Sequence, residues 1–167
     1  MTPDLLPVDD ELRLRPFAGD ADVDTAWPWY RDPETVTLVD GPGSRTYARD
    51  RVAAMYEALR AQGELYLIEL RTPEGTWDAV GDVTLAPETV PIVIAPGSRR
   101  QGIGRRVLLR LVDRARALGW TELHVREVYD GNEAARRLFT GVGFVARAAP
   151  PPAMSLRLSP LGTRPRP

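Results

Sequence analysis

The stretch Ile92-Val93-Ile94-Ala95-Pro96-Gly97-Ser98-Arg99-Arg100-Gln101-Gly102-Ile103-Gly104 leads into the clearest helical pattern of the chain. Its apolar beginning is typical of a central strand that is buried on both faces. Over residues 105–118 the apolar side chains then fall on one stripe at helical spacing, with arginines on the other faces. Such a helix begins with unpaired N–H groups and the positive end of its dipole, and glycines 102 and 104 let a ligand approach the backbone. The sequence therefore predicts a binding site for an anion such as pyrophosphate in this loop.

Two other nucleotide-binding motifs do not fit this loop. A Rossmann motif has its first glycine almost directly after the strand and a third glycine for helix packing, whereas seven residues separate Ile94 from Gly102, and Val107 occupies the third position. A Walker A motif needs a lysine, and all 22 basic residues of this chain are arginines. The planar guanidinium group binds phosphate well. We therefore expect phosphate contacts from the arginines at the rim of the loop, which are Arg99, Arg100, Arg105 and Arg106.

The composition is that of one soluble globular domain of ordinary size. The chain has 167 residues, of which 43% are hydrophobic and 27% are charged, and it contains no cysteine. A disulfide framework, a thiolate metal site and a cysteine nucleophile are therefore excluded, and the cytoplasm is the expected compartment. No apolar stretch approaches the roughly 20 residues that cross a bilayer, and the N-terminus lacks the pattern of a leader. We expect neither a membrane span nor a targeting segment.

A net charge of −1 hides an uneven distribution of charge along the chain. Residues 1–50 hold 11 acidic against 5 basic side chains, residues 51–98 hold 7 against 3, and residues 99–167 hold 5 against 14. This distribution favours an anionic ligand on the C-terminal part and a cationic ligand facing the N-terminal part. Ordinary solvated surface charge explains the same counts equally well. The charge distribution alone therefore does not show whether these residues bind ligands, and the sequence motifs are needed to distinguish the two interpretations.

The remaining patterns predict a series of short elements. Strands at residues 65–70, 79–85 and 90–95 are joined by short turns, which indicates an antiparallel meander. A helix is expected after Ser44, a plausible N-cap, and it ends at Gly63. The other expected elements are a strand at 12–15, a helix within 20–30 that Pro28 shortens, the helix at 105–118, a strand at 121–128 parallel to the strand before it, a helix at 132–140, strands at 144–148 and 154–158, and loose tails at 1–10 and 161–167.

Two segments resemble motifs of the GNAT superfamily of N-acetyltransferases. The run Arg99-Arg100-Gln101-Gly102-Ile103-Gly104 is similar to the superfamily signature Arg/Gln-x-x-Gly-x-Gly/Ala. Downstream, Asn132-Glu133-Ala134-Ala135-Arg136-Arg137-Leu138-Phe139-Thr140-Gly141-Val142-Gly143-Phe144 is similar to its segment Asn-x-x-Ala-x-x-Leu-Tyr-x-x-x-Gly-Phe. The two occur in the expected order, with a helix and a strand between them. The part from Leu12 to Glu34 resembles, more loosely, the branch that contains ribosomal-protein and aminoglycoside acetyltransferases.

The resemblance implies an α+β fold with a mixed central sheet of about 6–7 strands, helices on both faces and one splayed pair of parallel strands. A single N-acetyltransferase domain is expected over residues 11–160. Acetyl-CoA enters between the splayed strands in this superfamily, without a metal. The matching residues would therefore bind the cofactor: Ile92, Val93, Ile94 and Asn132 its pantetheine, Phe139 near its thioester, and Arg99, Arg100, Gln101, Gly102, Ile103, Gly104 and Arg105 its diphosphate. The alternatives are a core role for the strand and an N-cap role for Asn132.

Acetyl transfer to an amine needs a general base, because an ammonium group has no lone pair with which to attack a thioester. Glu127 is the predicted catalytic residue. It shares strand parity with Leu123 and Val125, which predicts that it is partly buried at the end of its strand. In ribosomal-protein acetyltransferases of the superfamily a glutamate precedes by five residues the asparagine that Asn132 matches. The resemblance therefore supports Glu127 in this role.

Alternatives to Glu127 as the general base stay open. Asp82 and Glu88 are rival bases, and Glu127 would be an ordinary surface residue if it paired with Arg126 or Arg147. His124, the only histidine of the chain, has the opposite parity and is expected on the polar face.

The sequence departs from the superfamily pattern at Phe139, where a tyrosine usually protonates the leaving thiolate. Tyr129 is a candidate substitute for this proton donor. Without one, the chain is an acyl-CoA-binding module with little or no turnover, which is the alternative to an enzyme. The aromatic residues Trp27, Trp29 and Tyr30 lie in an acidic region that often lines the acceptor cleft in the superfamily. They favour a cationic amine or an exposed peptide amine as acceptor, and the alternative is that they belong to the core.

The expected partners are acetyl-CoA and an amine acceptor. Neither nucleic acid nor a membrane is expected, because the cofactor accounts for the basic residues and the total charge is near zero. Many relatives pair as dimers, so a homodimer is compatible with the resemblance. The sequence does not indicate the acceptor or the preferred acyl chain.

Overall fold

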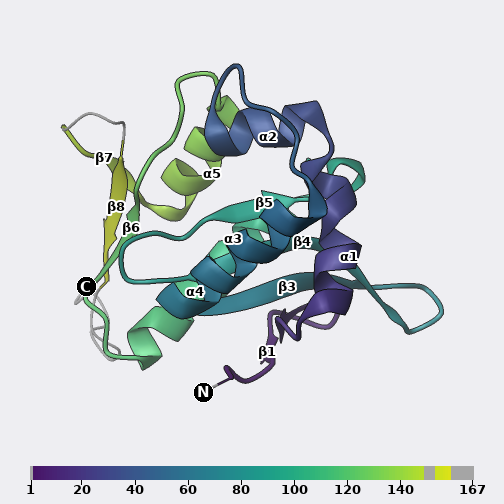
Figure 1. Cartoon of the computed structure of the whole chain (residues 1–167). Coiled ribbons are helices and arrows are strands. Elements are labelled where there is room, and N and C mark those ends of the chain that lie inside the picture. Colours follow the sequence, from purple (N-terminus) through teal and green to yellow (C-terminus); the bar gives the residue numbers. More distant parts are fainter. Residues whose placement is uncertain (1, 149–152, 159–167) are drawn as a thin grey trace.

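The computed structural model describes residues 2–148 and 153–158, which form five α-helices and eight strands (Figure 1). The helices are α1 (Asp20–Tyr30), α2 (Pro33–Asp40), α3 (Arg49–Gln62), α4 (Ile103–Ala117) and α5 (Glu133–Val142). The strands are β1 (Leu6–Pro7), β2 (Leu12–Pro16), β3 (Glu64–Arg71), β4 (Trp77–Leu85), β5 (Ile92–Ile94), β6 (Glu122–Val125), β7 (Val145–Ala146) and β8 (Met154–Arg157). No helix in these two ranges is long and apolar enough to cross a membrane.

Strands β1 to β5 form one antiparallel sheet in chain order, which confirms the expected meander of β3, β4 and β5. Asp82 of β4 stands opposite Leu67 on one side and Val93 of β5 on the other. Gly81, the residue before Asp82, lies where β4 and β5 approach each other closely. A Cβ atom on Gly81 would lie 2.2 Å from the carbonyl oxygen of Val93, so a glycine is required for β5 to pair at this distance.

The second sheet consists of β6, β8 and β7, and all its pairs are also antiparallel. In the part of the chain that the structure describes, no ladder joins β5 to β6, so the two sheets part between these strands. This separation is the splayed pair that the sequence predicted. The single expected sheet is thus two sheets, with β5 as an edge strand of the larger one.

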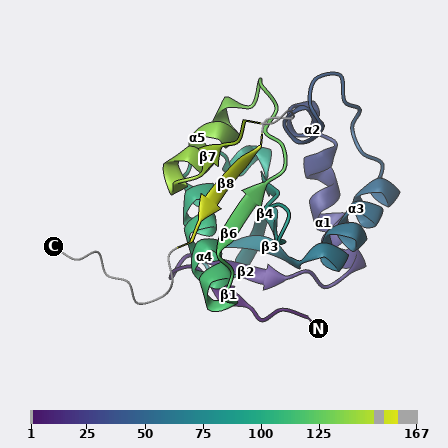
Figure 2. The ribbon, with the colours of Figure 1, turned by 90° about the vertical axis from the view of Figure 1, so that its left-hand side faces the viewer.

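The helices cover both faces of the larger sheet, and each face has its own hydrophobic core. Figure 2 shows α1, α2 and α3 on one side of the strands and α4 with α5 on the other. The stripe of α4, including Leu108 and Leu111, packs on Leu12, Leu14 and other residues of one face. The second core holds the residues of α1 and α3 against Leu65, Leu67 and other residues of the opposite face. The α+β class with helices on both faces is therefore confirmed.

Residues 6–9, which were expected in a loose tail, are held against the rest of the fold. Leu6 pairs with Leu14 and is 6% exposed, so burial of an apolar side chain adds β1 to the sheet edge. The carboxylate of Asp9 accepts hydrogen bonds from the Arg106 guanidinium at 2.6 and 2.8 Å. The expected tail at 161–167 lies outside the described residues.

The helices of the N-terminal half differ from the expectation in three ways. Helix α2 was not expected at all, although Asp32 caps its N-terminus and Pro33 occupies its first turn. Ser44 is not an N-cap: its hydroxyl donates to the carbonyl of Gly41, and α3 begins only at Arg49. Helix α1 extends over 11 residues despite Pro28, because a proline in the last turn disrupts few helical bonds.

Candidate functional site

Within residues 2–148 and 153–158, no side chain caps the N-terminus of α4. Gly102, the residue before the helix, adopts a left-handed conformation with φ 75°, and no side chain accepts a hydrogen bond from the first turn. The first helical bond runs from the N–H of Arg106 to the carbonyl of Gly102. The amides of residues 103–105 thus precede the helical ladder and are free to bind an anion, which fits the expected pyrophosphate site.

The two glycines of this loop have different surroundings. A Cβ atom on Gly102 would meet nothing within 4 Å, so this backbone is open to a ligand. A Cβ atom on Gly104 would lie 3.0 and 3.3 Å from two methyl groups of Leu138. Gly104 therefore serves the close packing of α4 on α5. Arg100 also has a positive φ, 62°, which is rare for a residue with a side chain and is found at functional sites.

Most of the loop arginines are held by other parts of the chain. The guanidinium of Arg99 donates to the carbonyl of Ile94 at 3.2 Å and to the hydroxyl of Thr35 at 2.6 Å, and it lies 3.2 Å from the Glu34 carboxylate. Arg105 donates to the carbonyl of Gly141 at 2.7 Å. Among the described residues neither Arg100 nor Arg105 has an ion-pair partner, and Arg100 also makes no side-chain hydrogen bond, so its guanidinium is the most available to a phosphate.

Strand β5 turns an unpaired edge toward β6. The N–H of Thr84 donates to Pro91, and the N–H of Ala95 donates to Val80, so residues 91, 93 and 95 point their backbone groups toward β4. Ile92 and Ile94 point theirs the other way by the same alternation. Of the three predicted pantetheine ligands, Ile92 and Ile94 thus point their backbone groups away from β4, although the Ile94 carbonyl already accepts a hydrogen bond from Arg99, while the backbone of Val93 is engaged with β4.

Helix α2 lies across the end of the gap and contacts both flanks. Arg99 holds its N-terminal half through Thr35, as described above. Asn132 caps α5 through its Oδ1 and donates its Nδ2 to the carbonyl of Leu38 at 3.2 Å. The ring of Tyr129 packs on Gly41, where a Cβ atom would lie 2.8 Å from a ring carbon. The run Asp-Pro-Glu at residues 32–34 is a helix-start signal from which sequence reasoning could have found α2.

Glu127 is exposed, in contrast to the burial expected from strand parity. Strand β6 ends at Val125, so the alternation of side chains does not reach residue 127. Burial and, after it, the negative charge of the nearby Glu127 carboxylate raise the pKa of Tyr129. The negative charge of Asp40 adds to this effect. The structure thus brings the two residues that were expected to move protons side by side, next to Asn132.

Asp82 has the most unusual environment of the carboxylates that sequence reasoning considered. It is 3% exposed and accepts hydrogen bonds from the hydroxyls of Tyr30 at 2.8 Å and Tyr56 at 2.7 Å. Burial raises the pKa of Asp82 to about 6, although both tyrosine hydrogen bonds act to lower it. No pattern in the sequence indicated this cluster, because its members come from α1, α3 and β4.

The aromatic residues fill the cores. Phe139 is 3% exposed and contacts Phe144 edge to face at 5.2 Å between ring centroids. Trp29 and Tyr30 are buried in the core beneath α1, which is the alternative that the sequence left open for them. Trp27 is partly buried, and its indole N–H donates to the carbonyl of Tyr47. These side chains do not form an aromatic wall for an acceptor in this structure.

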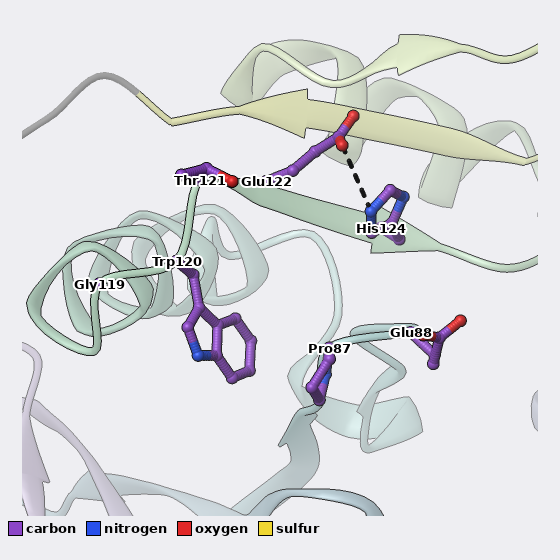
Figure 3. Close-up of a pocket in the computed structure, with 7 residues that line it drawn as sticks. All are labelled: Pro87, Glu88, Gly119, Trp120, Thr121, Glu122 and His124. Carbon is purple, nitrogen blue, oxygen red and sulfur yellow. Dashed lines mark ion pairs between the residues drawn. The ribbon is translucent and has the colours of Figure 1, made fainter.

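A hollow of about 390 Å³ lies at the other end of the gap, where β5 and β6 begin (Figure 3). In Figure 3 the rings of Trp120 and Pro87 face this hollow, and Glu122 contacts His124 at 3.6 Å. None of the predicted cofactor residues lines it. Glu88, one of the rival bases, lies here and is exposed, far in the fold from the α4 N-terminus.

The residues around the gap fit a long, anionic cofactor with an amide-containing arm. The free amides of α4, the open backbone at Gly102 and the charge of Arg100 suit a diphosphate. The unpaired edge of β5 suits the amides of pantetheine. Within the described residues no group of three or more histidine or acidic side chains is placed to hold a metal ion.

Comparison with known proteins agrees with this fold. A family model described as an acetyltransferase (GNAT) domain matches residues 11–145. The structure is similar to RimL, the ribosomal L7/L12 alpha-N-protein acetyltransferase in complex with coenzyme A, with a TM-score of 0.73 and 14% identity over 93% of this chain and 98% of that one. It is also similar to spermidine N-acetyltransferase from Vibrio cholerae, with a TM-score of 0.70 and 16% identity over 90% and 97% of the two chains.

A third structure, a domain from Methanocaldococcus jannaschii, has a TM-score of 0.79 and 17% identity over 90% of this chain and 100% of that one. No curated protein matches the sequence. The chain belongs to the GNAT acetyltransferase family, as its two motifs indicated. Its domain is therefore that of an acyltransferase, of the acetyl-CoA-dependent N-acetyltransferase type.

Proposed function

We propose that this protein transfers an acetyl group from acetyl-CoA to a primary amine of a small molecule or peptide, by direct attack in a ternary complex between β5 and β6. The uncapped N-terminus of α4, which opens beside the unpaired edge of β5, is the observation that carries this proposal. It places a site for a diphosphate beside an edge of β5 that no described strand covers, along which the arm of the cofactor would lie.

The chain's own residues have separate tasks in binding. The amides of residues 103–105 and the guanidinium of Arg100 hold the diphosphate. The backbone groups of Ile92 and Ile94 and the side-chain amide of Asn132 orient the pantetheine arm. Asn132 has to exchange its bond to Leu38 for this contact. Acetyl-CoA supplies a thioester carbonyl that an amine can attack.

Glu127 is our candidate for the residue that takes the proton of the amine, directly or through a water molecule. The new N–C bond forms as the C–S bond breaks, the proton leaves the nitrogen for the carboxylate, and the electron pair leaves on sulfur. Tyr129 is our candidate for the hydroxyl that donates a hydrogen bond to this sulfur. Phe139 has no donor and is buried, whereas the phenol of Tyr129 lies at the edge of the gap beside Glu127.

The second candidate function is that of an acyl-CoA-binding protein with little turnover. Phe139 and the exposure of Glu127 favour it, because a base in open solvent is less easily tuned than a buried one. The acceptor, the acyl chain, a homodimer, the absence of nucleic-acid and membrane partners, and the cytoplasmic location stay predictions.

Cofactor binding is tested by the substitution Gln101→Glu, which places a negative charge just before the α4 N-terminus. Repulsion of a doubly charged diphosphate at about 6 Å in water costs roughly 1.4 kcal/mol, so we expect about tenfold weaker CoA binding by calorimetry. Gln62→Glu, at the exposed end of α3, is the matched control because it changes the same charge on another surface. Equal affinity of the two variants would remove the loop from the cofactor site.

Turnover is tested by Glu127→Gln with a panel of primary amines and detection of the released thiol. We expect the rate to fall by about 100-fold or more while CoA affinity stays the same. Glu133→Gln, an exposed glutamate in the first turn of α5, is the control. An undiminished rate would clear Glu127 of the role of base. A wild-type protein that binds CoA but releases no thiol with any amine would support the second candidate function.

A further inference from the structure

Asp82 is a buried carboxylate without a cationic partner. Of the three carboxylates that the structure describes as buried, Asp22 binds Arg15 and Glu69 binds Arg13 and Arg15. Asp82 receives only two tyrosine hydroxyls, and both donate to its Oδ2. A buried charge that nothing neutralises is costly for folding, so its presence calls for a use other than stability.

The second carboxylate oxygen of Asp82 is available. Both hydrogen bonds end on Oδ2, and Oδ1 receives none. Among the described residues, the hydroxyl of Thr84 is the one side-chain polar atom that is fully enclosed and has no hydrogen-bond partner, so Oδ1 is not fully enclosed. Thr84 lies two residues further along the same face of β4. This face of β4 therefore presents oxygen atoms that accept hydrogen bonds and lack a donor.

The strand next to Asp82 is the one that borders the gap. Asp82 stands opposite Val93 of β5, and beyond β5 no strand is paired. Two strand spacings, roughly 10 Å, thus separate the carboxylate from the middle of the gap. The intervening residues of β5 are apolar and partly exposed, so water screens the field of the carboxylate in part, as at an effective dielectric constant of about 20.

The groups that face Asp82 leave its charge uncompensated. Helix α1 contributes the phenol of Tyr30, α3 contributes that of Tyr56, and the neighbours on β3 and β5 are Leu67 and Val93. The charged groups further out are paired: Asp40 lies 3.1 Å from Arg51, and Arg99, which reaches the carbonyl of Ile94, lies 3.2 Å from the Glu34 carboxylate. The potential in this part of the gap is therefore negative, whereas the α4 end is positive.

We propose that Asp82 is a specificity-determining residue of the acceptor site, whose buried charge selects amines that carry a second positive charge besides the nitrogen to be acetylated. This inference rests on the proposed function, since it assigns a property to the acceptor of that reaction. It also gives a physical meaning to the acidic N-terminal half of the chain.

The expected selectivity follows from Coulomb's law. Two unit charges about 10 Å apart attract each other, at an effective dielectric constant of about 20, enough to change an equilibrium roughly tenfold. We therefore expect kcat/KM for 1,4-diaminobutane to exceed that for 1-aminobutane by roughly tenfold. The two amines have the same chain length and the same reacting group, so their ratio isolates the second charge.

The test measures this ratio for the wild type and two variants by mass spectrometry of the acetylated amines. In Asp82→Asn we expect the ratio to fall close to one, with CoA affinity unchanged. Asp78→Asn removes the same charge from an exposed position of the same strand, and its ratio is expected to match the wild type. In the wild type the ratio should also fall by severalfold between pH 8 and pH 5.5, as Asp82 takes up a proton, while Asp82→Asn shows no such change.

Each outcome decides the proposal. A wild type that prefers neither amine overturns it, and so does a preference that Asp82→Asn retains. Acetylation of both amines at equal rates leaves the proposed function standing and removes only the role of Asp82. Binding of CoA without acetylation of either amine overturns the proposed function and this inference together.

Discussion

Replacing Asp82 by asparagine is expected to stabilise the protein at neutral pH. The folded state raises the pKa of Asp82 from 3.8 to about 6. Each unit corresponds to 1.36 kcal/mol, so the ionised carboxylate costs about 3 kcal/mol of stability at a pH well above 6. Because the folded pKa is raised, the stability from this group is fully present below pH 3.8 and is lost as the pH rises through 6. Asparagine keeps an oxygen that accepts the hydroxyls of Tyr30 and Tyr56 and has no charge to bury.

Urea unfolding of the wild type, Asp82→Asn and Asp78→Asn at pH 8 and pH 5 measures this effect. At pH 8 we expect Asp82→Asn to be more stable than the wild type by about 1–3 kcal/mol, after allowance for the polar amide. At pH 5 the protonated wild type regains roughly 1.4 kcal/mol, so the difference narrows by that amount. Asp78→Asn should stay within about 0.5 kcal/mol of the wild type at both pH values. A less stable Asp82→Asn at pH 8, or a difference that does not change with pH, would refute the reasoning.

Three further substitutions test how the gap is built. Gly81→Ala should cost more than about 3 kcal/mol in chemical denaturation, because its Cβ would lie 2.2 Å from the backbone oxygen of Val93 and would force β4 and β5 apart; normal stability would contradict the pairing of β4 with β5. Gly104→Ala should cost about 1–2 kcal/mol through its contact with Leu138, whereas a stabilised variant would show that α4 and α5 pack less closely. Leu6→Ala should cost about 2–3 kcal/mol of unfolding free energy, and an unchanged unfolding midpoint would contradict the burial of Leu6 in β1.

The sequence predicted those elements whose pattern reports directly on burial. The apolar stripe at 105–118 became α4, and the three strands with short turns became a meander, because both depend on side chains near one another in the chain. The loop between them was also predictable, since glycines and the start of a helix determine local backbone geometry. Helix α2 escaped notice because its eight residues are too few to show a periodic face.

The predicted site was less complete than the predicted fold. Parity arguments placed Glu127 inside the sheet, but they hold only while a strand continues, and β6 ends at Val125. Arg99 and Arg105 matched the motif by type, yet groups that are distant in sequence hold both of them: the hydroxyl of Thr35 binds Arg99, and the carbonyl of Gly141 binds Arg105. Residue type and spacing do not specify these partners.

The sequence by itself determined that this chain has an uncapped helix after a glycine loop, and thus an anion site, because both properties arise from bonds within a few residues. Only the tertiary structure decided where the charges lie around that site. Asp82 became a buried, unpaired carboxylate because α1 and α3 bring two tyrosines over β4, and β5 became an open edge because the chain continues into a separate sheet. Burial and pairing depend on residues that are far apart along the chain, so they come into existence only when the elements pack.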